Sequence, residues 1–439
     1  MKTKQVLARN PLGRRTAATA AMVAMVALTS SMATAGSVSA MTRHSGGRSA
    51  ITLTVLDYWG GPPAGVEFPK LIKQYEAAYP NVHIQETSVP QPSFVSKVLE
   101  DAAGGNTPDV IIGDNPDVPD FTHTGILAPL TKLMPSTGLT TSDFYPGPMQ
   151  AATWDGVVYG VPVGSNVELL YYNKALLAKA GVAVPRTWAQ LSAAALKLTN
   201  KAKNIYGFGA GLYAGEENTW DWENYLWDVG GSLADLNSPA AAKALTWWTS
   251  FVKNGSSPAA EVTTSFDGEI PTLFAEGQLA MAETGSWNLS VVAGDAPKTH
   301  LSWGVTTLPT PSAGQSPVVP FGGEDFSVGK TDATHEAAAW AFIRWLFAPN
   351  RISSFANGLS YLTPLKAAVP AYLKAYPLYA PVATEMGHSE SRTANLAYNY
   401  PQASQDIWTA IDEVLDGRLT VPAALKTMAS DVTPLVVVK

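Results

Sequence analysis

Cysteine does not occur anywhere in the 439 residues of the chain. Its absence excludes disulfide bonds, thiolate catalysis, zinc sites with thiolate ligands and a lipid anchor on an N-terminal cysteine. The fold must therefore be stabilised by buried apolar side chains and by hydrogen bonds.

Charged residues are scarce as well, at 15% of the chain, and the formal net charge is -7. A chain without an excess of positive charge has no field that attracts phosphates, so nucleic acid is not an expected partner. A neutral or weakly charged ligand fits this composition better. Hydrophobic residues make up 46%, which is enough for a large core, and the length is typical of two or more domains.

Long apolar runs are confined to the N-terminus. There, a run from Ala17 to Leu28 follows several basic residues and precedes small residues up to Ala40, as in an export signal. The run is shorter than the ~20 apolar residues that span a bilayer. We therefore expect a signal peptide at 1–40, cleaved after Ala40, and a periplasmic or extracellular mature protein. The export route stays open, although Arg14 and Arg15 hint at the twin-arginine route.

Motifs of catalysis and cofactor binding are also missing. The sequence has no G-x-S-x-G elbow, no phosphate-binding P-loop and no G-x-G-x-x-G fingerprint, and its six histidines show no metal-ligand spacing. We therefore predict no catalytic residue, no cofactor and no metal site. The carboxylates of "GEENTWDWENYLW" keep a secreted glycoside hydrolase open as the alternative, because such enzymes use a pair of acids.

Strand and helix patterns alternate in the N-terminal part, with short loops between them. This alternation predicts an α/β fold with a largely parallel sheet. The expected strands are 51–59, 81–89 and 108–114, and the expected helices are 67–80 and 93–105.

Longer helical segments follow, and strand character returns around Trp303. This return predicts that the chain crosses back to the first domain. The expected helices are 188–200, 222–229, 240–252, 271–278, 333–347, 350–357 and 406–419. We expect an N-terminal α/β lobe of 51–162 plus 303–330 and a helix-rich α/β lobe of 163–300 plus 333–439.

Aromatic residues are abundant, with 13 Trp and 16 Tyr, many of them beside acids, amides or glycines. A sugar presents an apolar face and a rim of hydroxyls, so its site needs flat rings together with carboxylates and amides. Trp287, between Ser286 and Asn288, is predicted to face such a ligand. Tryptophans on amphipathic helices are predicted to lie in the core, namely Trp247, Trp248, Trp340, Trp345 and Trp408.

Ligands of open α/β sheets bind beyond the carboxyl ends of the strands. The polar and aromatic residues just after the expected strands are therefore candidates for the site. They are Tyr58, Trp59, Asp114, Asn115, Gly323, Glu324 and Asp325.

Several segments together resemble the extracellular solute-binding proteins of carbohydrate ABC importers, in the family that includes the maltose-binding protein. The resemblance covers almost the whole mature chain. It rests on "FPKLIKQYEAAYPNVHIQ", "AGGNTPDVIIGDN", "DGVVYGVPVGSNVELLYYNKALLAKAGVAVPRTWAQL", "FAEGQLAMAETGSWNL", "WGVTTLPTP" and "GRLTVPAALKTM". It implies a two-lobed periplasmic-binding-protein fold with a hinge and a ligand cleft between the lobes. The implied crossings lie near 162–164, 300–303 and 329–332.

The resemblance also implies roles for individual residues. Trp287 would stack on the sugar, Asp114 would bind its hydroxyls, and Arg392 would correspond to an arginine that some relatives aim at hydroxyls. Position in the family pattern adds further ligand residues, which are Asn115, Asn166, Glu168, Trp220 and Trp222. Glu217 and Asn288 are candidates because they are polar neighbours of these tryptophans and of Trp287.

The function implied by the resemblance is binding rather than catalysis. A monomer would bind a neutral di- or oligosaccharide, close around it by hinge rotation and deliver it to the membrane permease of an ABC transporter. A polyol, a glycerol phosphodiester or a peptide stays open as the ligand, and so does a surface adhesin as the kind of protein.

Overall fold

The computed structural model describes residues 50–212, 215–259 and 269–437. The expected signal peptide at 1–40 lies outside these residues. The described residues form one compact unit. Within the described residues, no helix combines the length and the apolar character that a membrane crossing requires.

The first sheet has five strands in the order β2-β1-β3-β11-β6. The strands are β1 (Ile51–Asp57), β2 (Val82–Ser88), β3 (Val110–Asp114), β6 (Gly160–Pro162) and β11 (Glu324–Val328). β1 pairs parallel with β2 and β3, whereas β11 pairs antiparallel with both β3 and β6. The predicted largely parallel sheet is therefore present, with the late strand β11 running in the opposite direction.

Helices cover this sheet because their apolar faces match its buried side chains. In α1 (Ala64–Ala78), the predicted positions Phe68, Leu71, Ile72 and Tyr75 are the buried ones. α2 (Gln91–Ala103) buries Phe94 and Val98 in a separate cluster.

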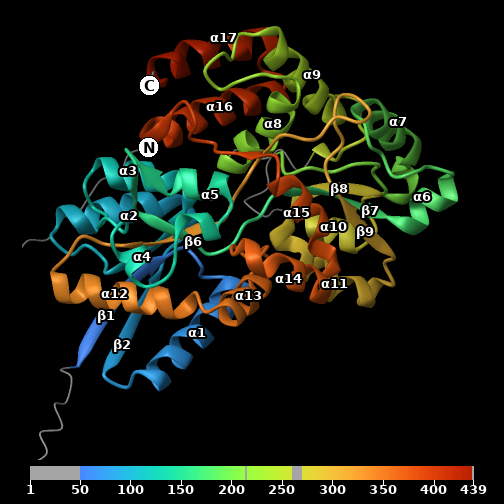
Figure 1. The fold of residues 1–439 in the computed structure, drawn as a ribbon. Coiled ribbons are helices and arrows are strands. Elements are labelled where there is room, and N and C mark those ends of the chain that lie inside the picture. The colour runs from blue at the N-terminus through green and yellow to red at the C-terminus, as the bar shows by residue number, and fades with distance from the viewer. Residues whose placement is uncertain (1–49, 213–214, 260–268, 438–439) are drawn as a thin grey trace, which may run out of the picture. The chain divides into compact units, whose positions relative to one another are not determined.

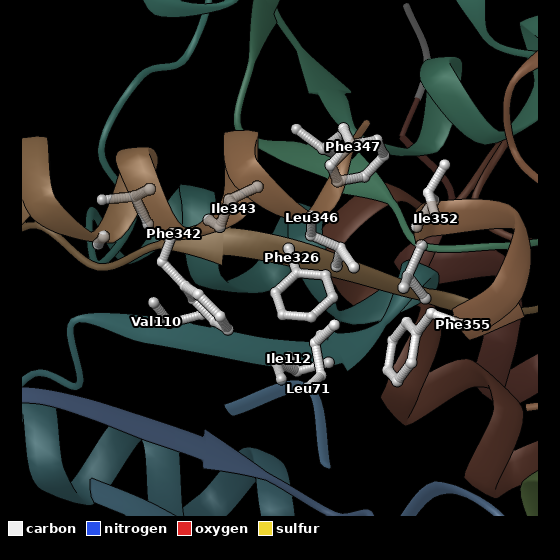
Figure 2. Packing of buried hydrophobic residues seen from close by; sticks show 14 of the residues in the cluster. Leu71, Val110, Ile112, Phe326, Phe342, Ile343, Leu346, Phe347, Ile352 and Phe355 are labelled. Atoms are coloured by element: carbon white, nitrogen blue, oxygen red, sulfur yellow. The ribbon is translucent and has the colours of Figure 1, made fainter. Parts of the chain in front are cut away.

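α12 (Ala333–Leu346) and α13 (Pro349–Gly358) also contribute to the core of the first sheet. Figure 2 shows Phe326 of β11 between side chains of β3 and of these two helices. Burial of each such side chain stabilises the fold by about 1.5–3 kcal/mol.

The second sheet has three strands in the order β8-β7-β9 and is antiparallel. Its strands are β7 (Glu168–Asn173), β8 (Met281–Gly285) and β9 (Trp303–Thr306). The helices of this part of the chain are α6 (Lys174–Ala180), α7 (Trp188–Leu198), α8 (Glu216–Asp228), α9 (Pro239–Lys253), α10 (Ile270–Ala275), α11 (Leu289–Thr299), α16 (Tyr400–Leu415) and α17 (Val421–Val432). α16 packs against α8, α9 and α17 (Figure 1).

Short elements connect these parts. They are α3 (Val118–His123), α4 (Leu133–Ser136), α5 (Pro146–Ala151), β4 (Thr153–Trp154), β5 (Val157–Val158), β10 (Val319–Pro320), α14 (Val369–Ala375), α15 (Ala380–Met386) and β12 (Ser389–Glu390). The short 3-10 helices η1 (Asn115–Asp117) and η5 (Ser286–Asn288) follow β3 and β8 directly.

Two parts of the chain belong to a different sheet or core from the one that the sequence predicts. β9, which contains Trp303, hydrogen bonds to β7 and not to the first sheet, so the return to the first sheet comes only with β11. α12 and α13 were expected with the second lobe, but residues such as Phe342 and Ile352 are buried in the core of the first sheet. An amphipathic helix shows that it packs on an apolar surface but not on which one, and this explains the second error.

Candidate functional site

A cavity of about 200 Å³ is lined by residues at the ends of strands from both sheets and by residues of helices and loops. Tyr58 and Trp59 follow β1, and Asp114 ends β3. Asn166 precedes β7, and Trp287 follows β8. The described residues that line the cavity are Tyr58, Trp59, Gly61, Pro62, Pro63, Ala64, Gln91, Asp114, Asn166, Trp220, Trp287, Gly323, Glu324, Leu359 and Tyr361.

Two indole rings form an aromatic part of the wall. Trp220 of α8 and Trp287 of η5 stack with their ring centroids 5.1 Å apart and their planes at 23°. β8 ends at Gly285 and η5 then turns the chain, so that Trp287 folds back over the strand end. A Cβ atom at position 285 would lie 2.0 Å from the Trp287 ring, which is why the close approach requires glycine. Rings of this kind bind apolar faces of ligands.

Glu324, the first residue of β11, is a polar group in the same wall, and its exposed fraction is 5%. Its Oε1 atom accepts hydrogen bonds from Tyr58 Oη at 2.9 Å, Trp59 Nε1 at 3.1 Å and Tyr361 Oη at 3.0 Å. Its Oε2 atom accepts none from the described residues. Burial raises the pKa of Glu324, and the three donors counteract this effect.

Asp114 is held by a buried guanidinium group. Arg392 Nη2 lies 2.8 Å and 2.9 Å from the two carboxylate oxygens of Asp114, and Nη1 lies 2.6 Å from Glu216 Oε1. The guanidinium also lies over the Trp220 ring, 4.9 Å from its centroid. Burial lowers the pKa of Arg392, but the two carboxylates outweigh this effect, so the pKa is raised well above its usual value. Burial raises the pKa of Asp114, and Arg392 opposes that rise.

The sequence model of a family described as bacterial extracellular solute-binding protein matches residues 70–381, which is more than half of the chain. The chain belongs to this family. The predicted membership is thereby confirmed.

Two solved structures and a curated relative are similar to the chain over most of its length. The cyclic alpha-maltosyl-1,6-maltose binding protein from Arthrobacter globiformis is 28% identical, with a TM-score of 0.72, over 88% of this chain and 99% of that one. The maltose-bound MalE3 of T. maritima is 24% identical, with a TM-score of 0.79, over 88% of this chain and 100% of that one. The sn-glycerol-3-phosphate-binding periplasmic protein UgpB of Agrobacterium fabrum is 24% identical over 81% of this chain and 83% of its own. The predicted two-lobed binding-protein fold is confirmed by the structural likeness.

Eight predicted site residues of this solute-binding protein come together at the cavity. They are Tyr58, Trp59, Asp114, Asn166, Trp220, Trp287, Gly323 and Glu324. Arg392 lies next to the wall, where it contacts Asp114 and Trp220 rather than lining the cavity itself.

Other predicted residues lie elsewhere for identifiable reasons. Trp222 is fully buried in the apolar core around the second sheet. It lies two positions after Trp220 on the same helix, and this spacing places the two side chains on opposite faces of the helix. Asp325 follows Glu324 on a strand and therefore points to the other face of the sheet. Asn115 Nδ2 donates to the Gly323 carbonyl at 3.0 Å, and Asn288 Nδ2 donates to Thr284 Oγ1 at 2.8 Å.

Glu168 and Glu217, also predicted, form a buried acidic group with Asp221. Carboxylate oxygens of the three lie within 4.8 Å of one another, a spacing that would fit a cation. Burial and then the charges of Glu168 and Glu283 raise the pKa of Asp221 well above its usual value. Carboxyl groups so placed also share protons, so the spacing alone does not assign a metal site.

Seven residues that line the cavity were not predicted from the sequence. Gly61, Pro62, Pro63 and Ala64 belong to the loop and helix start after β1, and the Gly-Gly-Pro-Pro sequence marked that loop without indicating its role. Gln91, Leu359 and Tyr361 come from distant segments. Tyr361 has no neighbouring motif that could have indicated its hydrogen bond to Glu324.

Proposed function

We propose that this protein binds a neutral di- or oligosaccharide in the cavity between its two sheets and delivers it to the permease of an ABC transporter. The observation that carries the proposal is the stacked pair Trp220 and Trp287 in one wall with the carboxylate of Glu324. Flat rings and hydrogen-bond acceptors are the two features that the faces and hydroxyls of a sugar require.

The ligands of the relatives support a carbohydrate but leave its size open. One solved relative is named for cyclic alpha-maltosyl-1,6-maltose and another is bound to maltose, whereas the Agrobacterium relative is named for sn-glycerol 3-phosphate. Residues 1–40 would act as the signal peptide of this extracellular protein, which we expect to be a monomer.

Binding would favour a closed form because the ligand contacts residues of both sheets at once. Trp59 and Glu324 adjoin the first sheet, and Asn166 and Trp287 adjoin the second. A ligand shifts the population toward a closed form only if that form gives it more contacts. The permease would then recognise the closed form.

The geometry favours binding over the glycoside hydrolase that the sequence left open. Of the carboxylates considered for catalysis, Asp114 accepts hydrogen bonds from Arg392 Nη2 at both of its oxygens, and Glu217 and Glu223 do not line the cavity. Members of the family are also solute-binding proteins.

A screen of neutral sugars tests this proposal. Thermal shift with mono-, di- and oligosaccharides would identify a ligand, and calorimetry would then give its stoichiometry. We expect one sugar bound per chain and no cleavage products after long incubation. Hydrolysis products would favour the enzyme, and the absence of binding to any sugar or polyol would contradict the proposal.

A further inference from the structure

Glu324 brings an uncompensated negative charge to the cavity wall. Three donors converge on its Oε1 atom, and its Oε2 atom accepts no hydrogen bond from the described residues. No ion pair within 4.0 Å joins Glu324 to a described cation. The side chain lines the cavity while its Oε2 atom is itself buried, so Glu324 acts on a bound ligand through its charge.

The neighbouring guanidinium cannot compensate this charge. Arg392 is already bound to Asp114 and Glu216, and its side chain is fully buried between them. Asp114 and Glu216 therefore share its single positive charge. Of the described residues that line the cavity, the ionisable ones are two acids and two tyrosines.

Two tyrosine hydroxyls of the wall direct their protons to Glu324 rather than into the cavity. They belong to Tyr58 and Tyr361. Asn166 Oδ1 is buried and accepts no hydrogen bond from the described residues. An anionic group beside Glu324 would therefore face negative charge that no neighbouring side chain offsets.

We propose that the cavity admits neutral and amine-bearing sugars and rejects their carboxylated and phosphorylated counterparts, with Glu324 as the residue that discriminates by charge. This inference rests on the proposed function and narrows its ligand class. According to this inference, the chain differs in ligand charge from the relative that is named for sn-glycerol 3-phosphate. Sequence similarity alone does not indicate this difference.

Three monosaccharides that share one ring and differ in charge test the inference. They are D-glucose, D-glucosamine and D-glucuronate. Their affinities are measured by calorimetric competition at about pH 6, where the amine is protonated and the uronate ionised. We expect glucosamine to bind at least as tightly as glucose, and glucuronate to bind at least about tenfold more weakly. Equal or tighter binding of glucuronate overturns the inference even if the protein is a sugar-binding protein.

The variant Glu324→Gln assigns the discrimination to this side chain. The substitution keeps the shape and an acceptor oxygen but removes the charge. The difference in affinity between glucose and glucuronate, called the affinity gap, should therefore disappear. Glu276→Gln, the same change at an exposed position, should leave the affinity gap unchanged. An affinity gap that persists in Glu324→Gln contradicts the role of Glu324. If Glu324→Gln does not fold, the order of the three affinities in the unaltered protein still decides the charge preference.

The two proposals fail in different ways. If neutral oligosaccharides bind but the charge of the ring makes no difference, only the inference is wrong. If none of the three rings binds, the inference is overturned, because no single ring then occupies the part of the cavity that Glu324 faces. If no neutral sugar of any length binds, the proposed function fails with it.

Discussion

A few side chains determine the character of the cavity. Trp287 supplies an apolar surface and Glu324 a carboxylate. Arg392 holds Asp114 and the Trp220 ring in place. Each depends on a neighbour that fixes its position, as Trp59 does for Glu324. Substitution of one residue should therefore affect either ligand affinity or stability, according to whether the residue faces the cavity or supports its wall.

Trp287→Ala should weaken the binding of a neutral sugar. The loss of the ring face removes apolar contact worth about 1–3 kcal/mol of binding free energy. Calorimetry with the sugar identified in the screen measures this change. Trp408→Ala, at a half-buried position on α16 outside the cavity, serves as the control and should bind normally. Unchanged affinity in Trp287→Ala would remove this residue from the site.

Arg392→Met should lower the stability of the protein. The substitution leaves the carboxylates of Asp114 and Glu216 without their buried cation, and loss of one partner of such a pair costs about 3–5 kcal/mol of unfolding free energy. Urea unfolding of the two proteins provides the measurement. The double variant Arg392→Met with Asp114→Asn should recover part of the loss. Additive effects of the two substitutions would show that the pair is not coupled.

At the scale of elements, patterns along the chain predict what is local. The alternating residues of β1 and the apolar face of α1 are where the sequence places them, and candidates at strand ends such as Tyr58 and Asp114 do meet at one cavity. Tyr361 and the position of β9 were not predictable, because both depend on contacts between distant segments that leave no periodic signal.

The end of β8 allows an independent test of the aromatic wall. Gly285→Ala introduces a methyl group at the place that the Trp287 ring occupies, so the ring must move away from the strand. We expect sugar affinity to fall as it does in Trp287→Ala, with an intact fold by circular dichroism. Gly294→Ala, where a Cβ atom meets nothing within 4 Å, should have no effect on affinity. Normal binding by Gly285→Ala would mean that the ring position is not critical.

Glu86 on β2 should make the stability of the protein depend on pH. Burial, together with the charge of Asp57, raises the pKa of Glu86 to about 7 from its usual value near 4.5. Because the folded state binds this proton more tightly than the unfolded state does, the stabilisation is complete below pH ~4.5 and is lost as the pH rises through about 7.

Glu86→Gln should therefore remove part of the decline in stability over that pH range. Melting temperature as a function of pH, measured for both proteins, shows the difference. Since the Glu86 side chain is partly exposed to solvent, we expect a modest effect. A parallel decline in the two proteins would exclude Glu86 as its source.

At the scale of the whole molecule, the fold brings residues from two sheets to one cavity. The family match and the resemblance to solved solute-binding proteins agree with the two-lobed fold that the sequence predicts. The division of the chain between the lobes was harder to predict, because α12 and α13 return to the core of the first sheet after β11. A ligand that contacts both sheets can couple binding to their relative motion.

The most direct test of this account is a crystal structure of the protein with the neutral sugar that binds most tightly in the screen. We predict that a sugar ring lies against Trp287 and that one of its hydroxyls donates to the carboxylate of Glu324. A sugar bound at another surface, with the space beside Trp287 and Glu324 filled only by water, would contradict the account.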